Sequence, residues 1–236
     1  MDSVTVCIAS IPSRKEMLKE TVKSLSPQAD KIMLFLNKYN DINLCREVKG
    51  GNPKVSYVIG DNRYGDAYKF FFCEANELKG YVFTADDDMI YPPDYVTHMI
   101  KGIEKYGRKA VVSLHGRTFD FPISSYYGGH KKYYSFRDKV NEDKQADVIG
   151  TGCMAWHTDT IQPKMENFPT ANMADIHFSI LAKKKNLPLM VLAHKMQWVH
   201  YMNPPDTIFA QKRKDDSEHV RRLNEVFANK LTDIAQ

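Results

Sequence analysis

Short apolar runs alternate with longer mixed segments through the first part of the chain. The apolar runs occupy residues 4–9, 31–36, 55–59 and 81–84. Continuous runs of this length are typical of strands buried on both faces of a parallel sheet. Residues 14–25 and 65–78 repeat apolar side chains three or four positions apart, which predicts amphipathic helices. These strand–helix units before residue 95 predict an α/β fold, with a mostly parallel central sheet flanked by helices.

The pattern of the second half is less regular. The elements expected there are a helix from Pro93 to about residue 106, strands at 110–114, 149–156 and 187–192, and helices at 174–185 and from about 217. Asp175 is expected as the N-cap of the helix at 174–185, a common structural role for aspartate. Residues 117–144 are polar and rich in tyrosine, which indicates an irregular, mobile loop. A functional lid and a plain surface loop remain open alternatives for this segment.

The size of the chain fits one domain. At 236 residues, we expect a single domain over 1–236, with a first half at about 1–95 and a second half at about 96–236. The net charge of +4 is mild, and nothing in the sequence indicates a nucleic-acid-binding arm. No apolar run reaches the length of a membrane span, and the first residues lack the features of a signal peptide. The four scattered cysteines favour a reduced, cytoplasmic protein.

Three consecutive carboxylates follow the apolar run at 81–84. Asp86, Asp87 and Asp88 repel one another, so a fold gathers them at the end of a buried strand only where a cation is present. Carboxylate oxygens suit Mg²⁺ or Mn²⁺, which are commonly held by one or two carboxylates and by substrate phosphates. A solvated acidic turn is the alternative, and the apolar lead-in and Pro92–Pro93 argue against it.

Other candidates depend on their position in the predicted sheet. The loop at 10–14 also follows a strand directly, so it should meet the carboxylates at the carboxyl edge of the sheet. Gly150 and Gly152 allow close backbone approach to a ligand, although two glycines at this spacing are a weak signal. The chain lacks the phosphate-binding, dinucleotide-binding, serine-hydrolase and zinc-protease motifs GxxxxGK[ST], GxGxxG, GxSxG and HExxH. The pattern therefore favours a nucleoside-diphosphate substrate whose two phosphates are bridged by a metal. The half at about 1–95 would then bind the nucleotide, and the half at about 96–236, with the mobile loop 117–144, would bind the acceptor.

The segment TADDDMIYPPDYV at 84–96 resembles the DxD region of GT-A glycosyltransferases. More narrowly, it is similar to the bacterial capsule family that adds α-linked N-acetylglucosamine in heparosan (K5-type) synthesis. Shorter matches occur in the same order over most of the chain, among them Ser10-x-Pro12-x-Arg14, Asp66-x-x-Lys69 and Asp175-x-x-Phe178. The last forty residues match poorly.

The resemblance implies a GT-A fold and a Mn²⁺- or Mg²⁺-dependent enzyme. It implies transfer of N-acetylglucosamine from UDP-N-acetylglucosamine, with retention, onto a capsular or cell-surface polysaccharide. A partner glycosyltransferase and a peripheral position at the inner face of the membrane are further expectations from the family. An inverting transferase that uses another UDP-sugar remains an alternative.

The same resemblance assigns roles by position. The implied donor-binding residues are Ser10, Pro12, Arg14, Asp66, Lys69, Asp86, Asp87 and Gly152. Asp88 would be the main metal ligand, Asp86 would contact the ribose or the metal, and His200 is a weaker third candidate. Asp175 occupies the place of the active-site carboxylate, which is a base in inverting relatives and stabilises the transition state or positions the acceptor in retaining ones.

Two rival functions remain at this stage. A sugar nucleotidyltransferase also combines an α/β nucleotide domain with acidic metal ligands, but residues 10–14 lack the glycines usual in its opening loop. A non-catalytic glycan-binding subunit of a polysaccharide synthase could use the tyrosine-rich segment as its binding surface. Donor hydrolysis that depends on Asp88 would separate a transferase from both.

Overall fold

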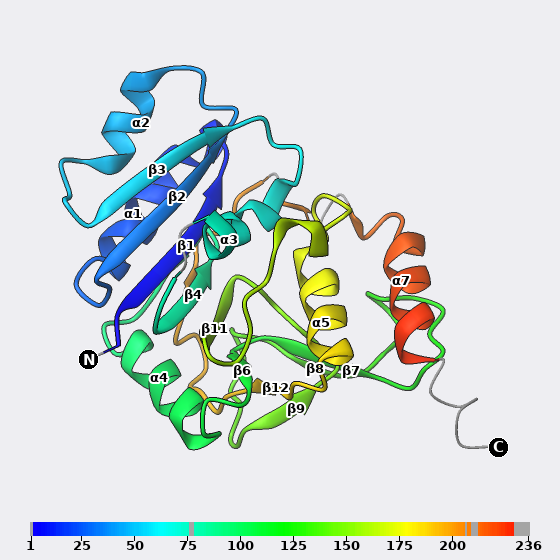
Figure 1. The fold of residues 1–236 in the computed structure, drawn as a ribbon. Coiled ribbons are helices and arrows are strands. Elements are labelled where there is room, and N and C mark those ends of the chain that lie inside the picture. Colours follow the sequence, from blue (N-terminus) through cyan, green and yellow to red (C-terminus); the bar gives the residue numbers. More distant parts are fainter. Residues whose placement is uncertain (1, 76–77, 206, 209–211, 229–236) are drawn as a thin grey trace.

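The computed structural model describes residues 2–75, 78–205, 207–208 and 212–228, and Figure 1 shows their arrangement. An eight-stranded sheet crosses the molecule in the order β3-β2-β1-β4-β11-β6-β12-β9. Its strands are β1 (Val4–Ser10), β2 (Lys31–Asn37), β3 (Val55–Gly60), β4 (Tyr81–Ala85), β6 (Val111–Ser113), β9 (Lys144–Ala146), β11 (Cys153–His157) and β12 (Leu189–Val191). Parallel pairs join β1 to β2, β1 to β4, β2 to β3 and β6 to β12. The predicted α/β fold with a mostly parallel sheet is therefore confirmed.

Helices cover both faces of this sheet because successive strand side chains point to opposite faces. On one face, Val6 and Ile8 of β1 belong to a core cluster with Leu18 and Met99. Leu18 lies in α1 (Lys15–Leu25) and Met99 in α4 (Tyr95–Lys105). The helix α2 (Ile42–Lys49) extends the same layer. On the other face, Cys7 belongs to a cluster with aromatic residues of the segments described next.

The second face is covered by η2 (Gly65–Phe70), α3 (Phe71–Ala75), η3 (Met165–Asn167) and α5 (Ala174–Lys184). Phe70 stacks on Phe168 and Phe178 at centroid distances of 4.4 and 5.4 Å. The expectation of one helix at 65–78 is corrected, because tighter 3₁₀ turns precede a short α-helix. These turns bury Lys69, which is only 2% exposed.

A smaller sheet lies beside the main one. It has the order β10-β7-β8 and contains β7 (Gly116–Phe119), β8 (His130–Tyr134) and β10 (Val148–Ile149). The irregular loop expected at 117–144 is corrected in part. Antiparallel pairing with β7 makes a strand of the polar run at 130–134, which has no apolar alternation, whereas 120–129 and 135–143 form no helix or strand. The strand expected at 149–156 is likewise divided by a glycine turn into β10 and β11, which belong to different sheets.

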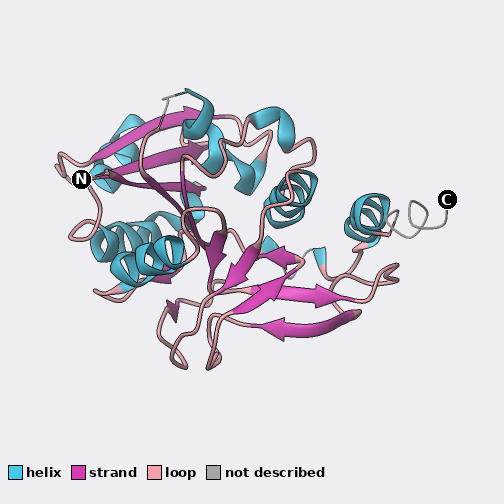
Figure 2. Cartoon of the chain, turned by 60° about the horizontal axis from the view of Figure 1, so that its bottom comes forward, coloured by secondary structure: helices cyan, strands magenta, loops and turns pink. Residues whose placement is uncertain are grey.

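Two helices cover this smaller sheet. Figure 2 shows α5 beside α7 (Ser217–Phe227), the last helix before the grey C-terminal trace. Leu223 and Phe227 of α7 are in one buried cluster with Ile176 of α5 and Phe119 of β7. The predicted final amphipathic helix is confirmed.

A two-stranded ribbon completes the fold. It pairs β5 (Met89–Ile90) with β13 (His200–Tyr201). The last strand of the chain was expected at 187–192, but β13 follows that segment. The helix α2, which the sequence analysis did not predict, begins after Asp41, whose side chain accepts a hydrogen bond from the Asn43 amide. Within the described residues, no helix is long and apolar enough to cross a membrane.

Candidate active site

The three carboxylates form a turn, here called the acid turn (Asp86–Asp88), between β4 and β5. Strand β4 fixes the first end of the acid turn, because β4 is buried along its length between parallel β1 and antiparallel β11. The ribbon fixes the other end of the turn, where the Met202 amide donates to the Asp88 carbonyl at 2.9 Å. The acid turn is therefore held by strands from both halves of the chain.

Cationic side chains neutralise two of these carboxylates. Arg14 Nη1 lies 3.0 Å from Asp88 Oδ2, and Lys69 Nζ forms an ion pair with Asp86 Oδ1. Burial raises the pKa of Asp88 to about 6, with Asp86 adding to the rise and Arg14 opposing it. Burial likewise raises the pKa of Asp87 to about 7, although a hydrogen bond from Ser10 lowers this pKa in part. These shifts express the cost of gathering negative charge away from water.

Lys69 is the central cation of the site. Burial by itself would lower the pKa of Lys69, but the nearby carboxylates of Asp86, Asp66 and Asp175 raise it overall. Its Nζ also lies 3.5 Å from Thr151 Oγ1. Lys69 therefore stays charged and links the acid turn to the opposite wall of the pocket.

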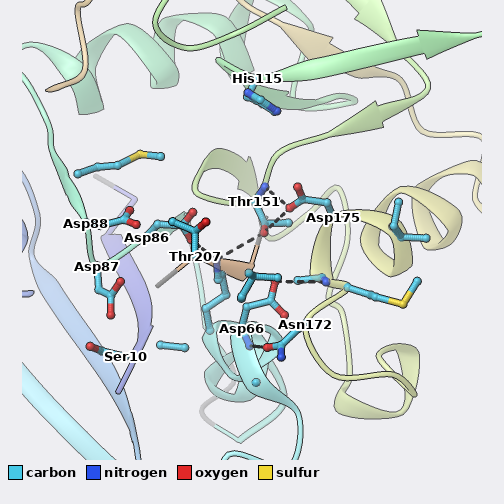
Figure 3. A pocket seen from close by; sticks show the side chains of 18 of the residues that line it. Ser10, Asp66, Asp86, Asp87, Asp88, His115, Thr151, Asn172, Asp175 and Thr207 are labelled. Atoms are coloured by element: carbon cyan, nitrogen blue, oxygen red, sulfur yellow. Dashed lines mark hydrogen bonds and ion pairs between the residues drawn. The ribbon is translucent and has the colours of Figure 1, made fainter. Parts of the chain in front are cut away.

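Asp175 stands on that opposite wall, in the first turn of α5 (Figure 3). Its Oδ1 accepts hydrogen bonds from the Thr151 amide and from Thr151 Oγ1, both at 2.7 Å. The N-cap of α5 is Met173, so the expectation that Asp175 caps the helix is corrected. Burial raises the pKa of Asp175, and the bonds from Thr151 oppose the rise. The carboxylate is thus aimed at the pocket and held in one orientation.

Asp66 lies between these groups. Burial raises the pKa of Asp66 to about 7, with Lys69 opposing the rise. Its Oδ2 accepts a hydrogen bond from the Ala174 amide at 3.4 Å, while its Oδ1 is buried without a hydrogen-bond partner. An unsatisfied buried carboxylate oxygen is costly, so this atom is suited to receive a donor from a bound ligand.

Gly152 contributes space. A Cβ atom at this position would lie 2.1 Å from Asp86 Oδ2, so any other residue would displace the Asp86 carboxylate. The Gly152 carbonyl accepts hydrogen bonds from the Asp86 amide and from Tyr91 Oη. A larger residue here would therefore disturb the ion pair between Asp86 and Lys69.

These groups surround a cavity of about 470 Å³. The expected site residues that line it are Ser10, Arg14, Asp66, Lys69, Asp86, Asp87, Asp88 and Asp175. Figure 3 shows Ser10 and the acid turn on one side, with Thr151 and Asp175 on the other. Pro12 and Gly152 do not line the cavity: Pro12 is exposed at the start of the 3₁₀ turn η1 (Pro12–Arg14), and Gly152 lies against Asp86. His200 is exposed and does not line the cavity, whereas its neighbour Tyr201 does.

Several cavity residues of the second half are not predicted from the sequence. The cavity is also lined by His115, Arg117, Tyr126, Tyr127, Tyr133, Thr151 and His219. The richness of tyrosine in this region was visible in the sequence, but which side chains face the cavity depends on the pairing of β7 with β8.

A divalent cation fits the acid turn in part. Among the residues that the structure describes, no group of three or more His, Cys, Asp or Glu side chains is placed to hold a metal ion. Asp88 Oδ1, however, is buried without a hydrogen-bond partner, and Asp86 is two residues away. Such a pair suits an ion that takes its remaining ligands from substrate phosphates and water.

Comparison with known proteins agrees with this geometry. The family model for glycosyl transferase family 2 matches residues 5–160, which is more than half of the 236-residue chain. The matched part includes β1 from its second residue, the acid turn and β11, and it ends before Asp175 and α7. No curated protein matches the chain.

Proposed function

The chain belongs to glycosyl transferase family 2, and on this premise we propose that it transfers N-acetylglucosamine from UDP-N-acetylglucosamine, with retention, onto a capsular or cell-surface polysaccharide. The protein is a glycosyltransferase with the α/β fold of the GT-A class. The observation that carries the proposal is the meeting of the acid turn, Arg14, Lys69 and Asp175 around one cavity.

The donor would occupy the side of the cavity formed by the first half of the chain. Ser10, Arg14 and the acid turn lie at the carboxyl ends of parallel strands β1 and β4, where ligands bind in open α/β sheets. Mn²⁺ or Mg²⁺ would be held by Asp88 and Asp86 with the two phosphates. When bound, the ion neutralises the charge that develops on the departing diphosphate. Arg14 and Lys69 add positive charge from the protein side.

Asp175 would act beside the reacting sugar carbon. In the retaining reaction its carboxylate would stabilise positive charge on the sugar ring or position the acceptor hydroxyl. An inverting reaction is a second candidate, favoured by the raised pKa of Asp175, because a more basic carboxylate is a better acceptor for the hydroxyl proton. The bonds from Thr151 orient the carboxylate in either case.

The acceptor would enter from the second half of the chain. The hairpin of β7 and β8 and the helix α7 supply that side of the cavity. We further propose association with a partner glycosyltransferase at the inner face of the membrane, as the resemblance to capsule enzymes implies.

Asp88→Asn tests the donor site. The variant keeps an oxygen for Arg14 but loses the charge, so we expect Mn²⁺-dependent UDP affinity to fall about 100-fold. Isothermal titration measures the affinity, and thermal unfolding shows that the fold persists. Asp94→Asn is the matched control, because Asp94 lies outside the cavity and its replacement can still accept the hydrogen bond from Trp198. Equal UDP affinity in wild type and Asp88→Asn would overturn the donor assignment.

Donor and stereochemistry are tested separately. We expect slow Mn²⁺-dependent hydrolysis of UDP-N-acetylglucosamine in preference to other UDP-sugars. NMR of the product formed on capsule oligosaccharides should show an α-linkage. A β-linkage would select the inverting candidate.

A further inference from the structure

Strand β3 forms one edge of the main sheet. It stands first in the strand order, and among the strands that the structure describes it pairs with β2 alone. Its sequence, VSYVIG, contains no charged residue and no proline. Proteins usually protect an edge strand with a charge, a proline or a bulge, because its open backbone groups can bind another strand. The β3 edge lacks these protections, so it is a candidate interaction surface.

The backbone of β3 is open at alternate residues. The Ile32 amide of β2 donates to the Lys54 carbonyl at 2.9 Å, which sets the phase of the parallel ladder. In such a ladder the N–H and C=O groups of one residue point to the same side, and those of the next residue point to the other side. The even-numbered residues of β3 therefore face β2, whereas Tyr57 and Ile59 direct both backbone groups away from the sheet.

Apolar side chains gather at the same edge. Among the described residues, six large apolar side chains are exposed, and three of them, Ile42, Val58 and Ile59, belong to β3 or to α2 beside it (Figure 1). Val58 and Ile59 point to opposite faces of the sheet, because successive strand side chains alternate. Each face of the sheet thus ends in an exposed apolar side chain, which an added strand would cover.

The charges at the two ends of β3 favour a second copy of the same strand. Lys54 precedes the strand and Asp61 follows it, and both residues are exposed. In an antiparallel pair of two copies, Lys54 of one copy lies at the end where Asp61 of the other copy is found. A parallel pair would instead bring like charges to the same end. The edge is therefore complementary to itself in the antiparallel direction.

We propose that β3 pairs antiparallel with β3 of a second copy of this chain, about a two-fold axis at Val58. In this register Val58 opposes Val58 of the other copy in a non-hydrogen-bonded pair, and Tyr57 opposes Ile59 in a hydrogen-bonded pair on either side. The open N–H and C=O groups of Tyr57 and Ile59 all gain partners. Pairs of an aromatic and a β-branched side chain are favourable across strands. The same patch serves both copies, so the assembly closes as a dimer.

The dimer leaves each copy with its own cavity. The segment after β3 contributes Asn62 and Gly65 to the cavity lining. Because the strands of the two copies run in opposite directions, the two cavities lie at opposite ends of the joined sheet. The inference concerns assembly, so it does not depend on the proposed glycosyltransferase function.

Disulfide trapping of Val58→Cys tests the register. The non-hydrogen-bonded pair places the two Cα atoms about 4.5 Å apart, which suits a disulfide. We expect a covalent dimer under mild oxidation at about 100 μM protein, seen by non-reducing electrophoresis. Ser56→Cys is the matched control, because it is exposed on the same face but its two copies lie roughly 13 Å apart. All four native cysteines are buried, so they should not cross-link.

Hydrogen exchange and sedimentation test the unmodified surface. The Tyr57 and Ile59 amides should exchange more slowly at about 1 mM protein than at about 10 μM, since only the dimer bonds them. The Ser56 and Val58 amides should not change, because they already bond to β2. Val58→Lys places like charges opposite each other and should weaken dimerisation about tenfold or more. Met196→Lys, at an apolar position that is 65% exposed elsewhere, should not.

Each outcome decides the proposal. A covalent dimer in Val58→Cys and none in Ser56→Cys supports it, whereas equal cross-linking of both variants, or of neither, overturns it. A wild-type protein that stays monomeric at about 1 mM also overturns it and leaves the edge to a different partner. A dimer that Val58→Lys does not weaken uses another surface and overturns it as well. If Val58→Lys does not fold, the concentration dependence of exchange at Tyr57 and Ile59 decides in its place.

Discussion

The two walls of the cavity handle charge in opposite ways. On the donor wall, Asp86 is paired with Lys69 and Asp88 with Arg14. On the acceptor wall, Arg117 is surrounded by tyrosine rings, here called the tyrosine cage (Tyr126, Tyr127 and Tyr133), and no described carboxylate pairs with it. On the first wall Asp86 and Asp88 each have a cationic partner before a ligand arrives, whereas on the second wall Arg117 has no described ion-pair partner although Asp175 lines the same cavity.

This difference suggests that the donor wall positions side chains around the ligand, whereas the acceptor wall selects ligands by their charge. A balanced network holds its side chains in place and can exchange one partner for a metal or phosphate at modest cost. An uncompensated cation favours one sign of ligand charge strongly and discriminates against neutral molecules. We therefore expect the donor wall to be the more sensitive in stability and the acceptor wall the more sensitive in specificity.

The largest expected effect comes from breaking the balance of the donor wall. Lys69→Met leaves several buried carboxylates without their shared cation, which should lower the free energy of unfolding by about 3–5 kcal/mol at pH 7.5. Urea denaturation measures the change. The loss should shrink at pH 5, where the carboxylates can take up protons. Lys132→Met, at an exposed position, should change stability by less than about 0.5 kcal/mol, and an equally small change in Lys69→Met would contradict the balanced network.

A smaller effect is expected where the tyrosine cage is anchored. Asp216→Ala removes three hydrogen bonds and should cost about 1–2 kcal/mol of stability. It should also speed hydrogen exchange at the Tyr126 and Tyr127 amides, measured by NMR. Asp215→Ala is the neighbouring control, because Asp215 accepts from the Ser217 amide and not from the cage. Unchanged exchange in Asp216→Ala would mean that the cage does not depend on this carboxylate.

The smallest expected effect concerns pH. Burial raises the pKa of Asp66 to about 7, so the folded protein keeps a proton that the unfolded chain releases above about pH 4. The contribution of Asp66 to stability therefore falls as pH rises from about 4 to 7. Relative to wild type, Asp66→Asn should gain about 1–2 kcal/mol of stability between pH 4 and pH 5.5 in thermal unfolding.

Asp61 provides a control of opposite sign for this titration. Hydrogen bonds from the Arg63 amide and from Tyr68 lower the pKa of Asp61. Asp61→Asn should therefore lose stability relative to wild type as pH rises from about 3 to 5, as the native carboxylate ionises. A flat difference between wild type and Asp66→Asn from pH 4 to pH 8 would contradict the buried acid at residue 66.

Much of the donor wall could be predicted from the sequence because its parts are local. Apolar runs become β1, β2 and β4, and the acid turn follows β4 directly. A parallel sheet brings the ends of such strands to one edge, so the meeting of Ser10 with Asp87 follows from topology. The helix α2 was missed because its segment buries only Cys45 and Val48 and depends on the Asp41 cap.

The acceptor wall could not be predicted in the same way. The strand β8 has no residue that is fully buried, so its pattern resembles that of a loop. Whether Arg117 faces the cavity depends on pairing with residues 130–134 and 148–149, and the sequence does not fix this register. The position of His200 depends in the same way on the ribbon, where its neighbour Tyr201 faces the cavity.

The ribbon of β5 and β13 also has a consequence for the time at which the site is completed. The nascent chain can form β1, β2 and β4 early, but the strand that fixes the acid turn lies about residue 200 and α7 follows it. During synthesis from the N-terminus, the carboxylates therefore lack the pairing of β5 with β13 until the residues near 200 have emerged. A ribosome-bound intermediate that ends at residue 160 would hold the whole family-matched segment and no closed cavity.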